Sequence, residues 1–216
     1  MSGRAAAAIP RWRVGEPVAS LVAVLARGGV LAIPTESSYG LAVDPRDAAG
    51  VEAIFRLKGR ERGKPLPVVA ADRAQIEALG VATDEPALAW AERHWPAALS
   101  VVLPLARALP ASGGEATIAV RVPADTGLRA LLGERGHALT ATSANPSGED
   151  PYLDPDAVAA WLAAAGAPAL VVDGGALPGG PPSTLVRYVG GVVELLRAGR
   201  VDVAALDLPP REAHLR

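Results

Sequence analysis

The chain of 216 residues contains no cysteine and only three histidines. Without cysteine it can form neither disulfides nor thiolate metal sites, and it has no cysteine nucleophile. His94, His137 and His214 are too few to predict a histidine-rich metal site. No apolar run approaches the ~20 residues of a membrane-spanning helix, and residues 1–10 lack the pattern of a signal peptide. We therefore expect a cytoplasmic protein with no membrane contact.

The composition is that of a globular protein, because 50% of the residues are hydrophobic and 20% are charged. The length suits a single domain. We expect one domain over residues 1–216, with its core at about 17–203 and frayed ends at 1–12 and 208–216. The formal net charge is -2, so any contact with RNA or phosphate must be local rather than general.

Both lysines of the protein, Lys58 and Lys64, lie in a basic stretch at residues 56–64. This basic stretch, Arg-Leu-Lys-Gly-Arg-Glu-Arg-Gly-Lys, has five cationic side chains and one anionic one. A lysine is a compact point charge, whereas an arginine is a rigid bidentate fork. The placement of both lysines here favours binding of a polyphosphate. The alternative is a solvated basic turn that follows a helix.

Apolar periodicity predicts alternating helices and strands and therefore an α/β fold. We expect helices at 17–27, 47–57 and 126–132, strands at 30–33, 100–103, 117–123 and 170–172, and a hairpin of 185–188 with 192–196. The wholly apolar run at 30–33 is typical of a buried strand. Several connections are short or hairpin-like, which indicates a mixed parallel and antiparallel sheet rather than a purely parallel one.

Polar residues gather where predicted strands end, which is where open α/β sheets place their sites. Residues 34–41 are expected to form a polar turn, although Thr35 and Glu36 also suit a helix cap or a surface turn. Arg121 lies on a strand among apolar neighbours and needs either a carboxylate of the fold or an anionic ligand. The remaining residues of this kind are Ser143, Asn145 and Ser183.

These residues predict a binding site without a covalent nucleophile. Ser143 has no base in its own turn or in the flanking strand, and His137 would have to fold back to reach it. The chain has no P-loop and no well-placed dinucleotide fingerprint. Hydroxyls, an amide, lysines and arginines suit small anionic or zwitterionic substrates that carry a phosphate chain. Chemistry at such a site would rest on positioning and charge stabilisation.

Eight short motifs occur in an order that resembles the YrdC/TsaC family of threonylcarbamoyl-adenylate synthases, over about residues 17–203. They are Pro34-Thr35-Glu36 with Tyr39-Gly40-Leu41, Lys58-Gly59-Arg60, Lys64-Pro65-Leu66, Trp95-Pro96, Arg121-Val122-Pro123, Ser143-Ala144-Asn145, Pro182-Ser183-Thr184, and Leu196-Arg197 with Gly199. Each motif alone is weak, but eight in order are specific. The resemblance implies a YrdC-like open, twisted mixed sheet flanked by helices, with a positively charged concave cavity, in the short single-domain form.

The resemblance also implies an activity, in which L-threonine, bicarbonate or CO2 and ATP give L-threonylcarbamoyladenylate and pyrophosphate. It places L-threonine at Thr35, Arg121, Ala141 and Ser183. It places ATP at Lys58, Arg60, Arg62, Lys64, Thr117, Ser143, Asn145 and Arg197. Mg²⁺ would come with ATP and take no ligand from the protein. The product would pass to a threonylcarbamoyl transferase complex that modifies tRNA, and contact with tRNA itself is possible.

The chain also departs from the family pattern, and other functions stay open. Arg187 stands where the family often has an acidic residue, and residues 37–38 and 97–100 differ as well. One alternative is a non-catalytic RNA-binding module that uses the basic stretch. A second is a paralogue that transfers or hydrolyses a carbamoyl group. The intact Ser143 and Asn145 turn and Arg121 argue for a small-molecule site over an RNA surface.

Overall fold

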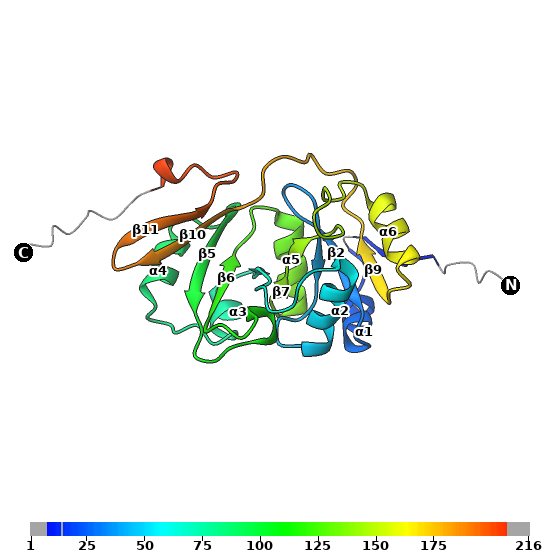
Figure 1. Cartoon of the computed structure of the whole chain (residues 1–216), viewed down its shortest axis with the longest axis horizontal. Helices are drawn as coiled ribbons and strands as arrows, with labels where there is room; N and C mark the ends of the chain where they lie inside the picture. Colours follow the sequence, from blue (N-terminus) through cyan, green and yellow to red (C-terminus); the bar gives the residue numbers. More distant parts are fainter. Residues whose placement is uncertain (1–7, 14, 207–216) are drawn as a thin grey trace, which may run out of the picture.

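The computed structural model describes residues 8–13 and 15–206, and its strands form two mixed sheets (Figure 1). The first has the order β1-β9-β2-β3-β8, with β1 at Arg11–Trp12, β9 at Ala169–Val172, β2 at Val30–Pro34, β3 at Tyr39–Ala42 and β8 at Thr142–Ser143. The second has the order β11-β10-β5-β6-β4-β7, with β11 at Val192–Arg197, β10 at Thr184–Val189, β5 at Leu99–Pro104, β6 at Thr117–Arg121, β4 at Val68–Val69 and β7 at Leu139–Thr140. Both sheets contain parallel and antiparallel pairs, so the predicted mixed α/β architecture is confirmed.

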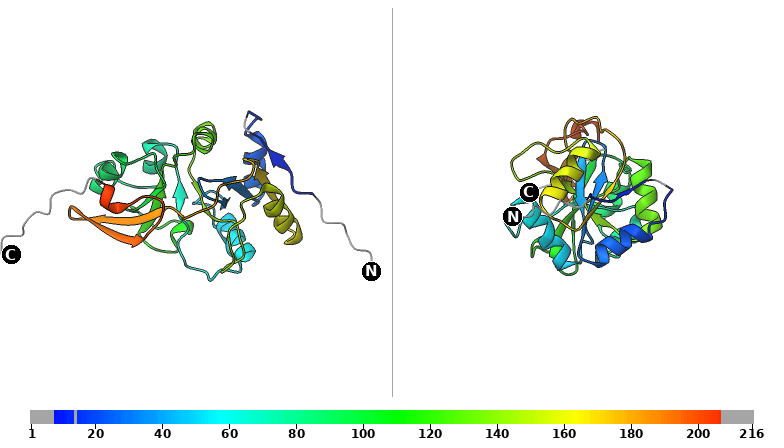
Figure 2. Two further views of the ribbon diagram at one scale, coloured as in Figure 1. Left: turned by 90° about the horizontal axis from the view of Figure 1, so that it is seen from above. Right: turned by 90° about the vertical axis from the view of Figure 1, so that its right-hand side faces the viewer.

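The helices pack beside the sheets, with α4 against β5 and α6 against β9 (Figures 1 and 2). They are α1 Ala19–Ala26, α2 Ala48–Lys58, α3 Arg73–Glu77, α4 Pro86–Glu92, α5 Thr126–Arg135 and α6 Pro155–Ala164, with 3-10 turns η1 Pro110–Ser112 and η2 Val203–Ala205. Aspartates at 47, 72, 125 and 154 accept backbone N–H bonds at helix starts, as N-caps do. None of the helices in the described part of the chain is long and apolar enough to cross a membrane.

Strand β2 is buried on both faces, which explains its wholly apolar sequence. Val30 and Ala32 belong to the larger core cluster, which also contains buried residues of the second sheet such as Val101. Leu31 and Ile33 face the other way, into a smaller cluster with Leu21 and Leu170. Alternate residues of a strand point to opposite faces, so a strand with cores on both sides must be apolar throughout. The predicted buried strand at 30–33 is thus confirmed.

The polar turn expected at residues 34–41 is shorter in the structure. Tyr39–Ala42 forms β3, which pairs antiparallel with β2, and the turn is limited to residues 35–38. The reason is tertiary, because the Tyr39 side chain is fully buried and its hydroxyl donates to the Gly175 carbonyl at 2.9 Å. The Tyr39 hydroxyl also accepts from the Gly174 N–H. These bonds hold Tyr39 and Gly40 in the sheet despite the polar residues before them.

The expectation of a frayed start over residues 1–12 is wrong for its last part. Arg11–Trp12 forms β1, which pairs in parallel with Val171 and Val172 of β9. Trp12 is only 2% exposed, and its indole N–H donates to the Pro17 carbonyl at 3.2 Å. Burial of an aromatic ring of this size outweighs the cost of ordering two residues. Of the other residues in the predicted frayed ends, 1–7 and 208–216 lie outside the described residues.

The chain passes from one sheet to the other at Ala141. Thr140 is the last residue of β7 in the second sheet, and Thr142 is the first residue of β8 in the first sheet. The Ala141 N–H donates to the Pro67 carbonyl at 2.8 Å, and the Thr140 N–H donates to the Val43 carbonyl at 2.9 Å. This junction brings the ends of strands from both sheets together, and several predicted site residues lie there.

Candidate substrate site

Lys58 is the last residue of α2 and is buried, so at this residue the alternative of a solvated basic turn does not hold. Its side chain reaches the turn after β8, where Nζ donates to the Ser143 carbonyl, to the Asn145 carbonyl at 3.0 Å and to Asn145 Oδ1 at 2.7 Å. The residue is only 4% exposed. Gly59 ends the helix with φ 59°, a left-handed conformation that glycine adopts without steric cost. The chain can therefore turn away sharply while Lys58 stays inside.

Lys58 and Arg60 lie close enough at this point for their charges to interact. Burial and, to a smaller extent, the nearby charge of Arg60 together lower the pKa of Lys58 to about 8. Burial also lowers the pKa of Arg60, whose Nη1 donates to Thr142 Oγ1 at 3.4 Å. Among the described residues, neither forms an ion pair with a carboxylate within 4.0 Å. Partly buried cations left in this state favour a bound anion.

The structure places a lysine beside Ser143, although no base lies near Ser143 in the sequence. Lys58 Nζ lies 3.4 Å from Ser143 Oγ. The three carbonyl-type oxygens around Nζ match the three protons of an ammonium group, so this lysine is arranged as a donor rather than as a base. His137 is exposed and lines a surface depression with Gln75 and Leu79. That Ser143 binds without acting as a nucleophile stays a prediction.

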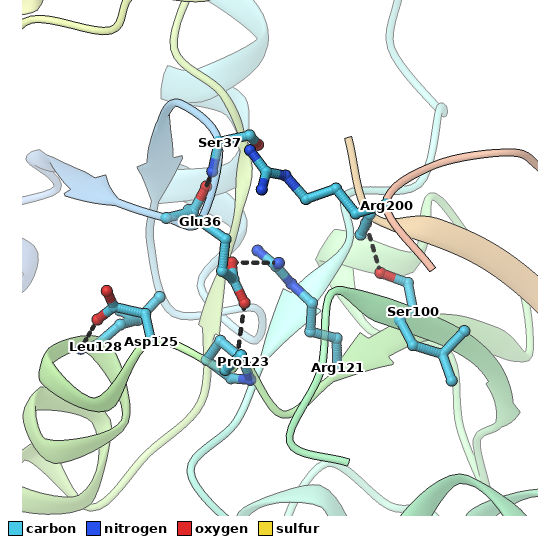
Figure 3. Close-up of polar contacts among 12 residues, drawn as sticks. Glu36, Ser37, Ser100, Arg121, Pro123, Asp125, Leu128 and Arg200 are labelled. Carbon is cyan, nitrogen blue, oxygen red and sulfur yellow. Dashed lines mark hydrogen bonds and ion pairs between the residues drawn. The ribbon is translucent and has the colours of Figure 1, made fainter. Parts of the chain in front are cut away.

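Arg121, at the end of β6, has a carboxylate of the fold as its partner. Its Nη1 lies 2.6 Å from Glu36 Oε2, and the two side chains are only 10% and 13% exposed (Figure 3). The second carboxylate oxygen of Glu36 accepts from the Ala124 N–H at 2.8 Å. Glu36 comes from the β2–β3 turn in the first sheet and Arg121 from the second sheet. The pair therefore bridges the two sheets at the site.

Ser183 and Arg197 meet beside this pair. Ser183 Oγ lies 2.9 Å from Ser100 Oγ, and Arg197 Nη2 donates to the Ser183 carbonyl at 2.8 Å and to its hydroxyl at 3.1 Å. Burial lowers the pKa of Arg197, and the charge of Arg121 adds to this effect. The excess of positive charge over the single Glu36 carboxylate suits a second carboxylate or a phosphate here.

Thr35 lies in the β2–β3 turn of the first sheet, and Ala141 lies at the junction between the two sheets. Thr35 Oγ1 donates to the Ser38 carbonyl at 2.8 Å and thereby closes the β2–β3 turn. A Cβ on Gly40 would lie 3.2 Å from the Thr142 carbonyl oxygen and 3.6 Å from Thr35 Cγ2, so glycine lets these segments approach closely. Gly40 pairs with Ser143 across β3 and β8, which brings the turn of Thr35 near that of Ser143.

Three of the residues implied for ATP lie apart from Lys58 in the structure. Arg62 is 77% exposed in its side chain and pairs with Glu52 at 2.5 Å, and Lys64 is exposed and pairs with Glu61 at 3.1 Å. Thr117 is at the opposite end of β6 from Arg121. It lines a cleft of about 440 Å³ whose other walls are Glu85, Pro86, Val102, Pro104 and residues 187–191. Arg187, the departure from the family pattern, therefore faces this cleft.

Comparison with known proteins places the chain in a family. A family model described as "Telomere recombination", that of Sua5, YciO and YrdC, matches residues 23–199. The chain belongs to the Sua5/YciO/YrdC family. A relative from Thiobacillus denitrificans named threonylcarbamoyl-AMP synthase is 40% identical over 180 residues, which are 82% of this chain and 93% of the relative. The predicted family resemblance is thereby confirmed.

Solved structures of the Sua5/YciO/YrdC family share the fold. The crystal structure of Pyrococcus abyssi Sua5 complexed with L-threonine matches with a TM-score of 0.76 at 30% identity, over 89% of this chain and 58% of that one. The present chain thus spans less than two thirds of the Sua5 structure. The structure of Escherichia coli YciO matches with a TM-score of 0.74 at 23% identity, over 92% of this chain and 98% of that one.

Two residues of the site were not among those predicted from sequence. From the sequence, Glu36 suits a helix cap or a surface turn, whereas in the structure its carboxylate is the partner of Arg121. Ser100 was seen only as part of a strand, whereas its hydroxyl contacts Ser183. Arg121 itself pointed to Glu36. A buried arginine requires an anion, and Glu36 is an acidic residue directly after Thr35, which was already assigned to the site. No comparable signal pointed to Ser100.

Proposed function

We propose that the protein makes L-threonylcarbamoyladenylate from L-threonine, bicarbonate or CO2, and ATP, with release of pyrophosphate. The observation that carries the proposal is the pair of the buried Lys58 and the half-buried Arg60 at the Ser143–Asn145 turn, which has no carboxylate partner among the described residues. The names of the relatives in the family support the same activity.

The phosphate chain of ATP would bind where Lys58, Arg60, Ser143 and Asn145 converge. Lys58, whose three protons meet oxygens of the Ser143–Asn145 turn, would exchange one of these acceptors for a phosphate oxygen. Lys58 and the half-buried Arg60 would then neutralise phosphate oxygens through charge-assisted contacts. Arg197 would reach the nucleotide from the second sheet, beside Arg121. Thr117 would contact the nucleotide from the 440 Å³ cleft, whose volume lies within the usual range for ligand pockets.

Mg²⁺ would enter with ATP and be held by phosphate oxygens and water, as is usual at nucleotide sites. In the described part of the chain, no group of three or more His, Cys, Asp or Glu side chains could hold a metal ion. The donor set at Lys58 is cationic, and it suits the phosphates rather than the metal.

L-Threonine would bind at Arg121, with Thr35, Ala141 and Ser183 around it. The fork of Arg121 suits a carboxylate, and Ser183 and Thr35 offer hydroxyls for the substrate's own hydroxyl. After its ammonium group loses a proton, the amine of threonine would attack CO2, or bicarbonate with loss of water, to give a carbamate. A carbamate oxygen would then attack the α-phosphorus of ATP, and pyrophosphate would leave. Such a reaction needs alignment and charge stabilisation but no covalent enzyme intermediate.

The product would be handed to a threonylcarbamoyl transferase complex for modification of tRNA. ATP, L-threonine and tRNA all occur in the cytoplasm, and we propose the cytoplasm as the place of reaction. The exposed Arg62 and Lys64 of the basic stretch are available for a weak contact with the backbone of tRNA. The ion pairs of Arg62 with Glu52 and of Lys64 with Glu61 would compete with tRNA, so we expect this contact to be weaker than binding at the substrate site.

The test is to incubate the protein with ATP, L-threonine, Mg²⁺ and ¹³C-bicarbonate and to identify the nucleotide product by mass spectrometry. The expected product carries one ¹³C atom in the carbamoyl group and forms together with pyrophosphate. A protein that binds tRNA but yields no labelled product and no pyrophosphate would be the RNA-binding module. Release of carbamate or phosphate without a threonine-containing nucleotide would identify a carbamoyl transferase or hydrolase instead.

A further inference from the structure

The Glu36–Arg121 ion pair raises a question about how the substrate binds. In the proposed function, Arg121 takes the carboxylate of the amino acid, but Arg121 Nη1 is already 2.6 Å from Glu36 Oε2. A ligand with a carboxylate alone would have to share Arg121 with Glu36. Two carboxylates on one arginine, with both side chains largely buried, repel each other and leave negative charge poorly compensated.

An α-amino acid resolves this conflict because it brings both charges. Its carboxylate can bind Arg121 while its ammonium group binds the Glu36 carboxylate. The zwitterion is then inserted into the existing ion pair, and each charge again faces an opposite one. Arg197 lies close enough to Arg121 for the two charges to interact, and it therefore adds positive charge beside the group that would bind the carboxylate.

The position of Glu36 is fixed independently of Arg121. The Ala124 N–H holds its second carboxylate oxygen at 2.8 Å. The turn that carries Glu36 is closed by the Thr35 hydroxyl on the Ser38 carbonyl, and the Gly179 N–H donates to the Ser37 carbonyl at 2.9 Å. The carboxylate is therefore held in place while Arg121 changes partner, and such preorganisation reduces the cost of binding.

We propose that Glu36 is the residue that binds the α-ammonium group of the substrate and thereby makes the site specific for amino acids over hydroxy acids. This assignment rests on the proposed function, because it takes L-threonine as the ligand. Thr35 and Glu36 then contact the same substrate from consecutive positions of one turn. Thr35 is assigned to the hydroxyl and Glu36 to the ammonium.

The test is calorimetric binding of two ligands to the full chain. The ligands are L-threonine and 2,3-dihydroxybutyrate, in which a hydroxyl replaces the ammonium group. A charge-assisted contact in a partly dry site is expected to make the wild-type protein bind L-threonine about 30-fold more tightly than the analogue. Glu36→Gln keeps the size of the side chain and an acceptor for the Ala124 N–H but lacks the charge. In this variant the preference should fall to about threefold or less.

Glu77→Gln is the matched control, because Glu77 pairs with Arg73 at 2.7 Å on α3. This variant also removes one carboxylate from an arginine, and it should keep the full preference for L-threonine. Persistence of the 30-fold preference in Glu36→Gln would mean that Glu36 merely positions Arg121, and the proposal would be overturned. A wild-type protein that prefers L-threonine by less than threefold would overturn it as well. Failure of the wild-type protein to bind L-threonine at all would instead refute the proposed function.

A second measurement does not depend on the folding of any variant. If Glu36 binds the ammonium group, the affinity of the wild-type protein for L-threonine must fall between neutral and strongly alkaline pH, as the amine of the ligand loses its proton. The affinity for 2,3-dihydroxybutyrate, which has no amine, should not follow the same curve. Parallel curves for the two ligands would overturn the assignment even if Glu36→Gln fails to fold.

Discussion

Lys58 Nζ donates a hydrogen bond of 2.7 Å to Asn145 Oδ1, although 87 positions separate the two residues in the chain. The Ser147 N–H also donates to the Lys58 carbonyl at 2.7 Å. The end of α2 and the turn after β8 therefore hold each other in place through both side chain and backbone. The arrangement fixes a positive charge at the junction of the two sheets.

Replacement of Lys58 by alanine should strongly reduce the rate of pyrophosphate release. Loss of a charge-assisted phosphate contact in a partly dry site costs about 2–4 kcal/mol of transition-state stabilisation, or roughly 30- to 1,000-fold in rate. The measurement is kcat/KM for ATP, with thermal unfolding to verify that the variant folds. Arg93→Ala removes an exposed positive charge at the C-cap of α4 and serves as control. Equal rates for Lys58→Ala and Arg93→Ala would contradict the assignment.

The affinity for ATP should fall as the pH rises through the pKa of Lys58, which burial and then the charge of Arg60 lower to about 8. Below this pH the ammonium group is present and can bind phosphate. Lys58→Arg keeps its charge to much higher pH, so its affinity for ATP, although altered, should stay flat between pH 7 and about 9. Identical pH profiles for the wild type and Lys58→Arg would show that another group titrates.

The same lowered pKa has an opposite consequence for stability. The folded protein releases the Lys58 proton near pH 8, whereas the unfolded chain keeps it until about pH 10.5. Between these values the unfolded state binds more protons, so the contribution of Lys58 makes the free energy of unfolding rise with pH. Titration of Lys58 is therefore expected to weaken ATP binding at pH 9 without destabilising the fold. Urea titrations at pH 7 and at pH 9 measure the free energy of unfolding and separate it from the change in ATP affinity.

L-Threonine should be a far better substrate than L-valine, while L-serine should lose less. The threonine subsite offers the hydroxyls of Thr35 and Ser183, and Ser183 is held by Ser100 and Arg197. A site built to hydrogen-bond a hydroxyl penalises an analogue without one, because its own polar groups are left unpaired. Serine lacks only a methyl group. The comparison is kcat/KM for the three amino acids, and equal values for valine and threonine would reject this subsite.

Ser143→Ala should lower turnover but leave measurable activity, and Asn145→Ala should behave similarly. Both residues are expected to aim donors at the nucleotide, and neither is expected to form a covalent bond. The nearby Lys58 donates to three carbonyl-type oxygens and is not arranged to remove the Ser143 proton. Peptide mass spectrometry of a quenched reaction is the direct measurement. A covalent adduct on Ser143 would overturn this view of the site.

Local patterns in the sequence determined the elements. The apolar run at 30–33 predicted a buried strand. In the structure, successive side chains of β2 point alternately into the larger and the smaller core cluster, so both faces are buried. Periodicity, the Asp47 cap and Gly59 delimited α2, since these signals act over a few residues. The same local reasoning stated that Arg121 needs an anion. It missed β1, where it predicted a frayed end, and β3, where it predicted a polar turn, because both strands depend on distant segments such as Val171 and Gly175.

The tertiary structure alone decided which of these residues meet. The partner of Arg121 is Glu36, 85 positions away, and the neighbour of Ser143 is Lys58, also 85 positions away. The order of the strands in the two sheets determines these long-range contacts, and local periodicity contains no information about strand order. The basic stretch illustrates the limit, since Lys58 points inward from the last turn of α2 while Arg62, four residues later, points into solvent. Lys58 is buried because its side chain contacts the turn of Asn145, whereas Arg62 has no such contact among the described residues, and composition cannot reveal this difference.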